Sequence, residues 1–178
     1  MTDAEDPIAR LKKQIRERGW GIAVDETMAF HRPELRTLFD LWRAKADAMA
    51  ALPRREDLDM RLLKPFLRHL SVMERAELEG KSSYRVRLQG SLLSDYFGAQ
   101  TGKLLEEAVP PELAARWTAA YDALLEARRP LRFVGSYDSG PMDYLISESL
   151  SVPLGNGDLP PTGILAATYY TPRHKSRD

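Results

Sequence analysis

The residues best suited to chemistry are few in this chain and widely separated. Its 178 residues include three histidines, His31, His69 and His174, and no cysteine. No two of these histidines have the spacing of a metal-binding pair, and a chain without thiolates has no cysteine-based metal site, disulfide or nucleophile. The sequence therefore predicts neither a metal centre nor thiol chemistry.

The sequence also lacks a recognisable motif for serine or carboxylate catalysis. The chain has no G-x-S-x-G segment, and Ser91 and Ser136 follow glycines at an expected helix start and within an expected strand. No glycine loop of the phosphate-binding type precedes a helix. The carboxylates that we examined show no paired spacing and are expected to be solvated: Glu106, Glu107, Asp138, Asp143 and Glu148. An enzyme is disfavoured, and a small enzyme with a buried polar cluster around Asp143, Glu148 or His69 remains an alternative.

The overall composition indicates one globular domain. Hydrophobic residues make up 43% of the chain, and Lys+Arg 26 equals Asp+Glu 26, so no net field attracts nucleic acid. No apolar run has the length of a membrane span, and the charged start MTDAEDPIARLKKQ lacks the apolar core of a signal peptide. We therefore expect a cytoplasmic protein that neither binds nucleic acid nor inserts into a membrane.

The elements that would position a site begin with a charged segment and an amphipathic helix. Residues 1–32 change from acidic to basic and are expected to be poorly ordered. Residues 33–51 are predicted to form a flanking helix between two prolines. Its apolar stripe consists of Leu35, Leu38, Phe39, Trp42, Ala46 and Met49. This stripe either packs on the domain's own sheet or pairs with the same helix of a second chain, so it is also a candidate homodimer interface.

Residues 52–171 are predicted to form the main domain, followed by a polar tail over 172–178. Strands are expected at 70–78, 84–88, 131–137, 144–152 and 163–170. The long helix is expected at 112–129. Tight-turn composition at Asp138–Pro141 and a longer turn, GNGDLPPTG, connect the last three strands. This pattern predicts an α+β fold with an antiparallel sheet and helices on one face, preceded by an N-terminal helical extension.

The stretch YRVRLQGSLLSDYFGAQTGKLLEE, from Tyr84 to Glu107, resembles a PAS domain. An alternating strand runs through a glycine into a short helix that ends in Phe97-Gly98. The segments LPRREDLD from Leu52 and VPLGNG from Val152 are similar to further motifs of the PAS-like family of small stand-alone bacterial proteins. The resemblance implies a five-stranded sheet with helices over one side and a non-enzymatic sensory or regulatory role.

The resemblance also bears on cofactors. Light-sensing relatives attach flavin or a cinnamoyl chromophore through cysteine, so covalent photochemistry of that kind is excluded here. Haem-binding relatives often take their axial histidine from the helical side of the domain. The predicted long helix contains no histidine, which argues against haem and leaves only His69 as a candidate haem ligand. The cofactor is therefore unknown.

A ligand cavity between the sheet and the central helices is a further implication of the resemblance. Apolar and aromatic side chains with a few polar groups typically line such a site. The candidates are Arg87, Tyr96, Phe97, Trp117, Tyr121, Phe133, Tyr144, Ile146 and Thr168. Arg85 or Arg87 would pair with an anionic ligand if its side chain faced inward. We expect a domain that binds a small molecule, a signalling protein or both; the alternative is a protein-interaction module with a solid core.

Overall fold

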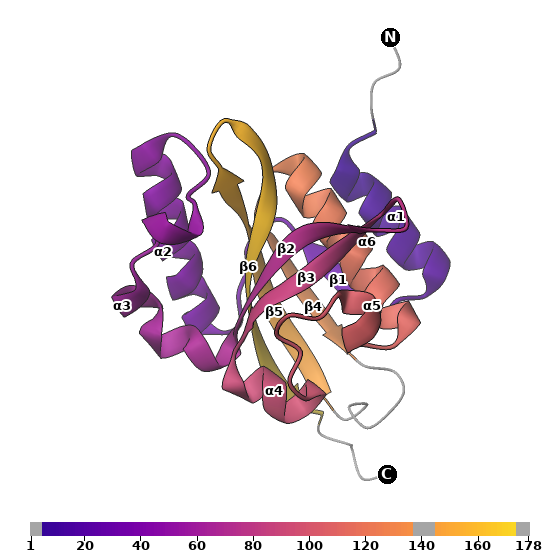
Figure 1. The fold of residues 1–178 in the computed structure, drawn as a ribbon. Coiled ribbons are helices and arrows are strands. Elements are labelled where there is room, and N and C mark those ends of the chain that lie inside the picture. Colours follow the sequence, from indigo (N-terminus) through magenta and orange to yellow (C-terminus); the bar gives the residue numbers. More distant parts are fainter. Residues whose placement is uncertain (1–4, 137–144, 174–178) are drawn as a thin grey trace.

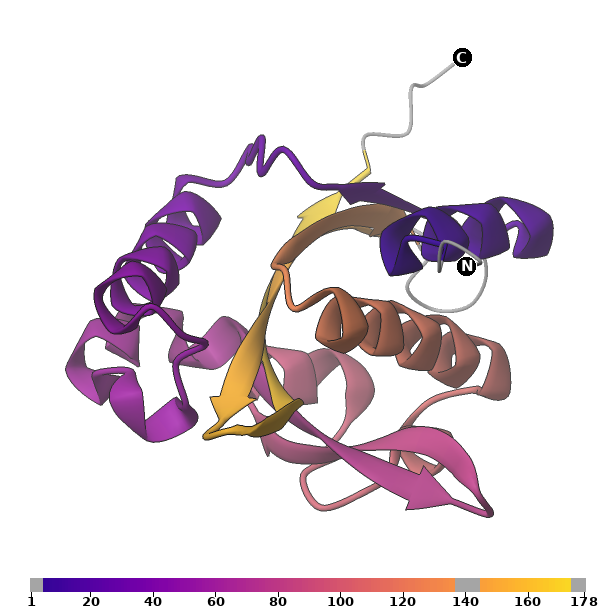
Figure 2. The same cartoon turned by 90° about the horizontal axis from the view of Figure 1, so that it is seen from above.

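A six-stranded antiparallel sheet forms the centre of the molecule, and helices cover both of its faces (Figures 1 and 2). The computed structural model describes residues 5–136 and 145–173. The strands are β1 (Ile22–Asp25), β2 (Leu70–Leu78), β3 (Lys81–Gln89), β4 (Leu131–Ser136), β5 (Leu145–Asn156) and β6 (Leu159–Pro172). The α-helices are α1 (Pro7–Arg18), α2 (Pro33–Met49), α3 (Met60–Leu63), α4 (Ser91–Phe97), α5 (Leu105–Ala108) and α6 (Pro111–Ala127). Two 3-10 helices, η1 (Arg55–Asp57) and η2 (Lys64–His69), complete the set.

The sheet contains one strand more than the sequence predicted. Its order is β1-β4-β5-β6-β2-β3, with every neighbouring pair antiparallel. The α+β class and the five expected strands are confirmed, and β1 is the additional edge strand. Only four residues long, β1 is too short to show a clear alternation, and its pairing with β4 defines it as a strand.

The N-terminal segment is part of the fold, which corrects the prediction of a poorly ordered region. Helix α1 buries Ile8, Leu11 and Ile15 in a core that it shares with α6. Residues three and four apart lie on one face of a helix, so this sparse stripe is sufficient for docking. Arg10 pairs with Glu126 of α6, which adds a polar contact at the edge of this interface.

The helices lie on both faces of the sheet, not on one face as predicted. Figure 2 shows α2 and α3 on one side of the sheet and α1 and α6 on the other. We call the α6 side the inner face; its core includes Tyr84, Val86, Phe133 and Ile164. We call the α2 side the outer face; its core includes Leu150, Val152 and Leu165. Alternate strand residues point to opposite faces, so one strand serves both cores.

Helix α2 packs against the outer face of its own sheet. Four members of its predicted apolar stripe, Leu35, Leu38, Phe39 and Trp42, are buried in the outer core, and Met49 is exposed. The Trp42 indole N–H also donates to the Pro153 carbonyl at 3.2 Å. The stripe therefore takes the first of its two predicted roles, and these four side chains are not available to a second copy of the chain in this arrangement.

The connections between the last strands differ from prediction. Strands β5 and β6 extend to Asn156 and from Leu159, so their turn is much shorter than the predicted GNGDLPPTG loop. Gly157 has a φ of 61°, a left-handed value that glycine adopts easily in a tight turn. The predicted turn at Asp138–Pro141 and the residues of the tail from position 174 lie outside the described residues.

Candidate functional site

A small, partly open cavity lies between the inner face of the sheet and the segment from α4 to α6. Its volume is about 70 Å³. Its lining combines apolar and aromatic side chains with hydroxyl and amide groups: Ser71, Met73, Val86, Gln89, Leu93, Phe97, Gln100, Leu105, Val109, Leu113, Trp117, Tyr121, Ser149, Ser151, Ala166, Thr168 and Tyr170. No charged side chain is among these residues, so the cavity presents only neutral hydrogen-bonding groups.

Hydroxyl groups from three neighbouring strands form the floor of the cavity. Ser151 of β5 and Ser71 of β2 both pair with Ala166 of β6, which places these residues in one row across the sheet. In the next row of the sheet, Ser149 Oγ and Thr168 Oγ1 lie 2.9 Å apart and share a hydrogen bond. Ser151 is 1% exposed, and its Oγ has no hydrogen-bond partner within residues 5–136 and 145–173. Burying a hydroxyl without a hydrogen bond is unfavourable. A polar group of a bound molecule that formed a hydrogen bond to this hydroxyl would remove that cost.

Two glutamines close the rim of the cavity. The Gln100 backbone N–H donates to Gln89 Oε1 at 2.9 Å, and Gln89 Nε2 donates to Gln100 Oε1 at 3.3 Å. Gln100 Nε2 also donates to the Ala108 carbonyl at 2.9 Å. Because Gln89 ends β3 and Gln100 lies beyond α4, these bonds attach the α4 segment to the sheet.

Gly90 permits a close approach at the start of α4. A Cβ atom added there would lie 2.3 Å from the Leu67 carbonyl oxygen and 2.5 Å from that of Arg68, both in η2. Only glycine fits this contact without a backbone shift. Gly90 therefore brings the cavity rim into close contact with η2, which lies toward the outer face of the sheet. Ser91, which lies at the helix start expected from the sequence, is the first residue of α4 and provides no side-chain cap.

Four of the nine predicted pocket residues line the cavity: Phe97, Trp117, Tyr121 and Thr168. Two more belong to the aromatic cluster around it. The Tyr96 ring lies 4.8 Å from the ring of Tyr170, and the Phe133 ring lies 5.9 Å from that of Trp117. These side chains support the cavity wall without lining it.

Two predicted residues lie elsewhere, and one is not described. Arg87 Nε pairs with Glu74 at 2.9 Å on the surface, and Arg85 donates to the Gly102 carbonyl, so neither arginine faces the cavity. Ile146 is 41% exposed; it lies on the outer-face side of β5, on the same side as Glu148. Tyr144 lies outside the described residues.

Sequence reasoning missed the hydroxyl floor and the glutamine rim. The segment ISESLS of β5 places serines at every second position, which was a visible signal of one shared face. A serine-bearing face is more often solvated than buried, so the signal became informative only once α6 was seen to cover it.

A second polar cluster lies on the outer face and corrects the prediction that Glu148 is solvated. Arg132, 6% exposed, donates from Nε to Glu148 Oε1 at 2.7 Å and from Nη1 to Asp25 Oδ2 at 2.9 Å. Glu148 also accepts the backbone N–H groups of His31 at 2.9 Å and Arg32 at 3.0 Å. The cluster therefore joins β1, β4, β5 and the start of α2.

The carboxyl group of Asp25 has an unusually low pKa, lowered from 3.8 to about 2. Burial alone would raise this pKa, but hydrogen bonds outweigh it. The donors are the hydroxyl and N–H of Thr27, the N–H of Ala29 and the guanidinium of Arg132. Asp25 is thus held ionised, as a structural anchor would require.

The contacts of His69 are those of a residue with a structural role. Its ring stacks on Tyr169 with centroids 3.8 Å apart, and Nδ1 lies 3.1 Å from the Thr168 carbonyl oxygen. Burial and the nearby charge of Glu34 raise the pKa of Tyr169. Neither His69 nor Glu148 lines the small cavity. Within the described part of the chain, no group of histidine and acidic side chains has the arrangement of a metal site.

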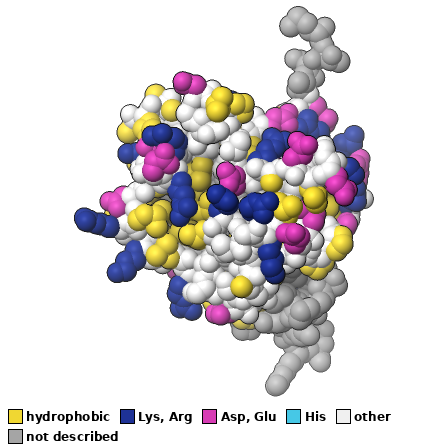
Figure 3. Space-filling view, in the orientation of Figure 1, with side chains coloured by type: hydrophobic (Ala, Val, Ile, Leu, Met, Phe, Trp, Pro, Cys, Tyr) yellow, Lys and Arg dark blue, Asp and Glu magenta, His cyan; other side chains and the backbone are white. Residues whose placement is uncertain are grey.

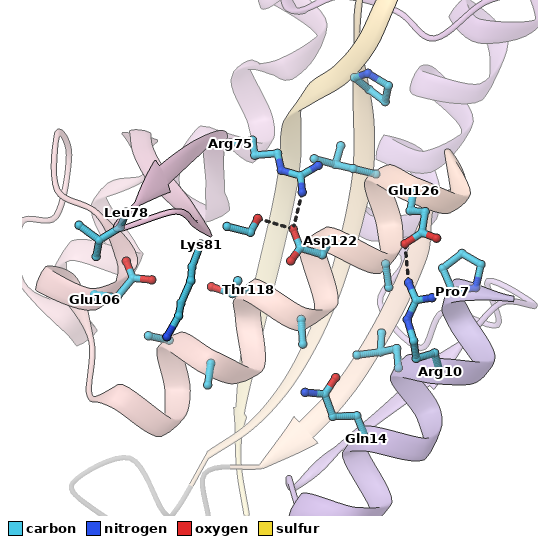
Figure 4. Close-up of a pocket in the computed structure, with 18 of the residues that line it drawn as sticks. Pro7, Arg10, Gln14, Arg75, Leu78, Lys81, Glu106, Thr118, Asp122 and Glu126 are labelled. Atoms are coloured by element: carbon cyan, nitrogen blue, oxygen red, sulfur yellow. Dashed lines mark hydrogen bonds and ion pairs between the residues drawn. The ribbon is translucent and has the colours of Figure 1, made fainter. Parts of the chain in front are cut away.

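A much larger open groove crosses the surface over α6. Figure 4 shows it between α1, α6 and the tip of the β2–β3 hairpin; its volume is about 1010 Å³. Asp122 lies in it and accepts from the hydroxyls of Ser82 and Tyr84, both at 2.7 Å, while Arg75 lies 3.5 Å away. Burial and the Asp122 carboxylate raise the pKa of Tyr84. Asp122 is thus held by groups of the protein itself, and we take the smaller cavity against the inner face of the sheet as the candidate binding site.

The surface carries charges of both signs. In Figure 3, Lys and Arg side chains lie among Asp and Glu side chains on the face shown. Several of these charges are paired, including Arg54 with Glu56 and Asp57. No helix among the described residues has the length and apolar character needed to cross a membrane.

The architecture defines an α+β domain with an antiparallel sheet, short helices at one end of the sheet and a cavity against its inner face. The sequence model of the PAS domain family matches residues 30–109, from just before α2 to the end of α5. This match supports the resemblance noted above for that part of the chain. No curated protein and no solved structure matches the chain. A PAS domain is in general a sensory or regulatory module.

Proposed function

We propose that this chain is a non-enzymatic sensory domain that binds a small molecule in the partly open cavity and reports the bound state to a protein partner. The observation that carries the proposal is the buried, unpartnered hydroxyl of Ser151 in a cavity between the sheet and α4 to α6. Most buried hydroxyl groups in proteins have a hydrogen-bond partner, either in the protein or in a bound molecule such as water. A bound molecule would provide the missing hydrogen bond.

The proposed output route runs through strand β5 to helix α2. Ser151 faces the cavity, and its neighbours Leu150 and Val152 face the outer core that holds α2. Pro153 then accepts the hydrogen bond from Trp42. A shift of β5 on binding would therefore change how α2 packs, and a partner that contacts the exposed side of α2 would sense this change.

The proposed partner surface is the solvent side of α2, which carries Asp40, Arg43 and Asp47. Homodimer formation through Leu35, Leu38, Phe39 and Trp42 would require α2 to leave its sheet, at the cost of a buried core. We therefore propose a heterologous protein partner for this surface. A cytoplasmic location is part of the proposal, because a chain without cysteine does not rely on an oxidising compartment.

The test is mass spectrometry of the freshly purified chain under native and then denaturing conditions. The proposal predicts a co-purifying small molecule that is released on denaturation, and its mass would identify the chemical class. Hydrogen exchange of the stripped and reloaded protein should then show changed protection in α2. Absence of both a bound molecule and any ligand-dependent change in α2 would refute the sensory function.

The second candidate function is a protein-interaction module without a ligand. The small cavity favours it, because about 70 Å³ holds only a few water molecules in the closed arrangement. This function predicts that ordered water satisfies Ser151 and that the native mass equals the sequence mass. A variant with the cavity filled would then retain its partner, whereas a ligand-dependent sensor would lose regulation.

A further inference from the structure

The cavity lining restricts the chemistry of its guest, and this inference rests on the function proposed above. The hydrogen-bonding side chains of the lining are Ser71, Gln89, Gln100, Ser149, Ser151 and Thr168, together with Trp117, Tyr121 and Tyr170 of its aromatic wall. All of them are uncharged. An ionised guest would lose its hydration and find no counter-charge, which disfavours both carboxylates and ammonium groups.

The nearest arginines on β3 do not change this conclusion. Arg85 Nη1 donates to the Gly102 carbonyl at 2.7 Å, and Arg87 pairs with Glu74. Both side chains lie among exposed groups, outside the cavity lining. The sequence-based idea of an anionic ligand paired with one of these arginines therefore does not apply to this site.

The floor provides one specific polar contact for the guest. Ser149 and Thr168 bond to each other, so their hydroxyls are already engaged. Ser151 Oγ is a fully buried floor hydroxyl with no hydrogen-bond partner among the described residues. A guest with one hydroxyl, amide or carbonyl group would satisfy it, while Phe97, Trp117 and Tyr121 would contact the rest of the guest.

A guest larger than water would have to enter the cavity through its rim. The sheet and α6 form continuous secondary structure, whereas the α4 segment up to Gln100 is attached to β3 through the Gln89–Gln100 bonds. Backbone bonds of Gly102 and Lys103 to Val86 hold the chain beyond Gln100 to β3. Displacing Phe97 and Gln100 together with this segment would enlarge the cavity without breaking the sheet. We propose that the cavity accepts one uncharged small aromatic molecule, oriented by a hydrogen bond to Ser151 and admitted by movement of the α4 segment.

Benzamide and benzoate are suitable probes, because they have nearly the same shape and differ in charge. We expect benzamide to bind the purified chain in isothermal titration, and benzoate to bind at least tenfold more weakly at neutral pH. Ser151→Ala should weaken benzamide binding about tenfold, as expected for one lost hydrogen bond. Ser147→Ala is the matched control: Ser147 lies on the same strand, is equally buried, and donates to the Gly135 carbonyl away from the cavity.

The outcomes separate this inference from the proposed function. Equal binding of the two probes, or equal affinity of wild type and Ser151→Ala, would overturn the ligand class and orientation. A co-purified charged molecule would do the same, yet it would leave the sensory function intact. Failure of benzamide to bind at millimolar concentration would also overturn the inference; the native mass measurement, which does not depend on a chosen probe, would then decide the function separately. Thermal unfolding of each variant verifies that it is folded.

Discussion

The indole N–H of Trp42 donates to the carbonyl of Pro153 at 3.2 Å, and this bond fastens helix α2 to the strand that forms the cavity floor. Pro153 lies two residues beyond Ser151 on β5. The two sides of the sheet thus share one rigid element. A packed strand responds to a change on one face by shifting its contacts on the other, which is the physical basis of the proposed output.

Trp42→Phe tests the energetic weight of that bond. The substitution keeps an aromatic ring in the outer core and removes the N–H donor, so we expect a loss of about 1 kcal/mol in the free energy of unfolding, measured with urea. Trp20→Phe is a comparison, because the Trp20 N–H donates to Glu112 Oε1 at 3.1 Å in a more exposed setting. An equal or larger loss for Trp20 would contradict the importance of the Pro153 contact.

Much of the fold could be predicted from the sequence, because strong periodic patterns act locally. The expected strand at 70–78 has the observed bounds of β2, and the expected helix at 112–129 begins and ends within two residues of α6. These elements carry their own start and stop signals.

The parts that could not be predicted depend on long-range contacts. Strand β1 exists because Ile22 and its neighbours pair with β4, more than a hundred residues away. In the sequence, nothing distinguishes Gln89 and Gln100 from other polar residues. Their contact forms only when the α4 segment folds against the sheet. Four of the predicted pocket residues line the cavity, whereas strand parity alone did not reveal that Arg87 faces outward.

The low pKa of Asp25 predicts a pH dependence of stability. A carboxyl with a folded pKa of about 2 and an unfolded pKa near 3.8 stabilises the fold above pH 3.8, and this contribution disappears as the pH falls toward 2. We expect about 1 to 2 kcal/mol at neutral pH, allowing for screening at a partly exposed site. The difference in unfolding free energy between wild type and Asp25→Asn should therefore shrink between pH 5 and pH 2. A constant difference would refute the assignment.

The pair formed by Arg132 and Glu148 should show strong coupling. Glu148→Gln removes one of the two carboxylates that compensate the buried guanidinium, so we expect a loss of about 2 to 3 kcal/mol, somewhat below that for a buried pair with no second partner. In a double-mutant cycle with Arg132→Met, the double variant should be at least 1 kcal/mol more stable than additivity predicts. Additive effects would show that the two side chains act independently.

Gly90→Ala tests the contact between the cavity rim and η2. The added methyl group would meet two backbone carbonyl oxygens that cannot rotate away, so we expect a loss of about 2 to 3 kcal/mol and faster hydrogen exchange in α4. Gly102→Ala is the control, because its Cβ would meet open space and only its φ of 91° is unfavourable, at about 1 kcal/mol. Equal losses would indicate that Gly90 is not tightly packed.

Ser151→Val tests whether the cavity is available to a guest. The substitution removes an unpartnered hydroxyl and adds methyl groups to an empty space, so the ligand-free protein should gain about 1 to 2 kcal/mol in unfolding free energy while losing benzamide binding. Valine is also well suited to a strand. Ser147→Val should instead lose about 1 kcal/mol, because Ser147 Oγ donates to the Gly135 carbonyl. A destabilised Ser151→Val would mean that the hydroxyl is already satisfied by bound water, and the cavity would then belong to a solid core with no place for a ligand.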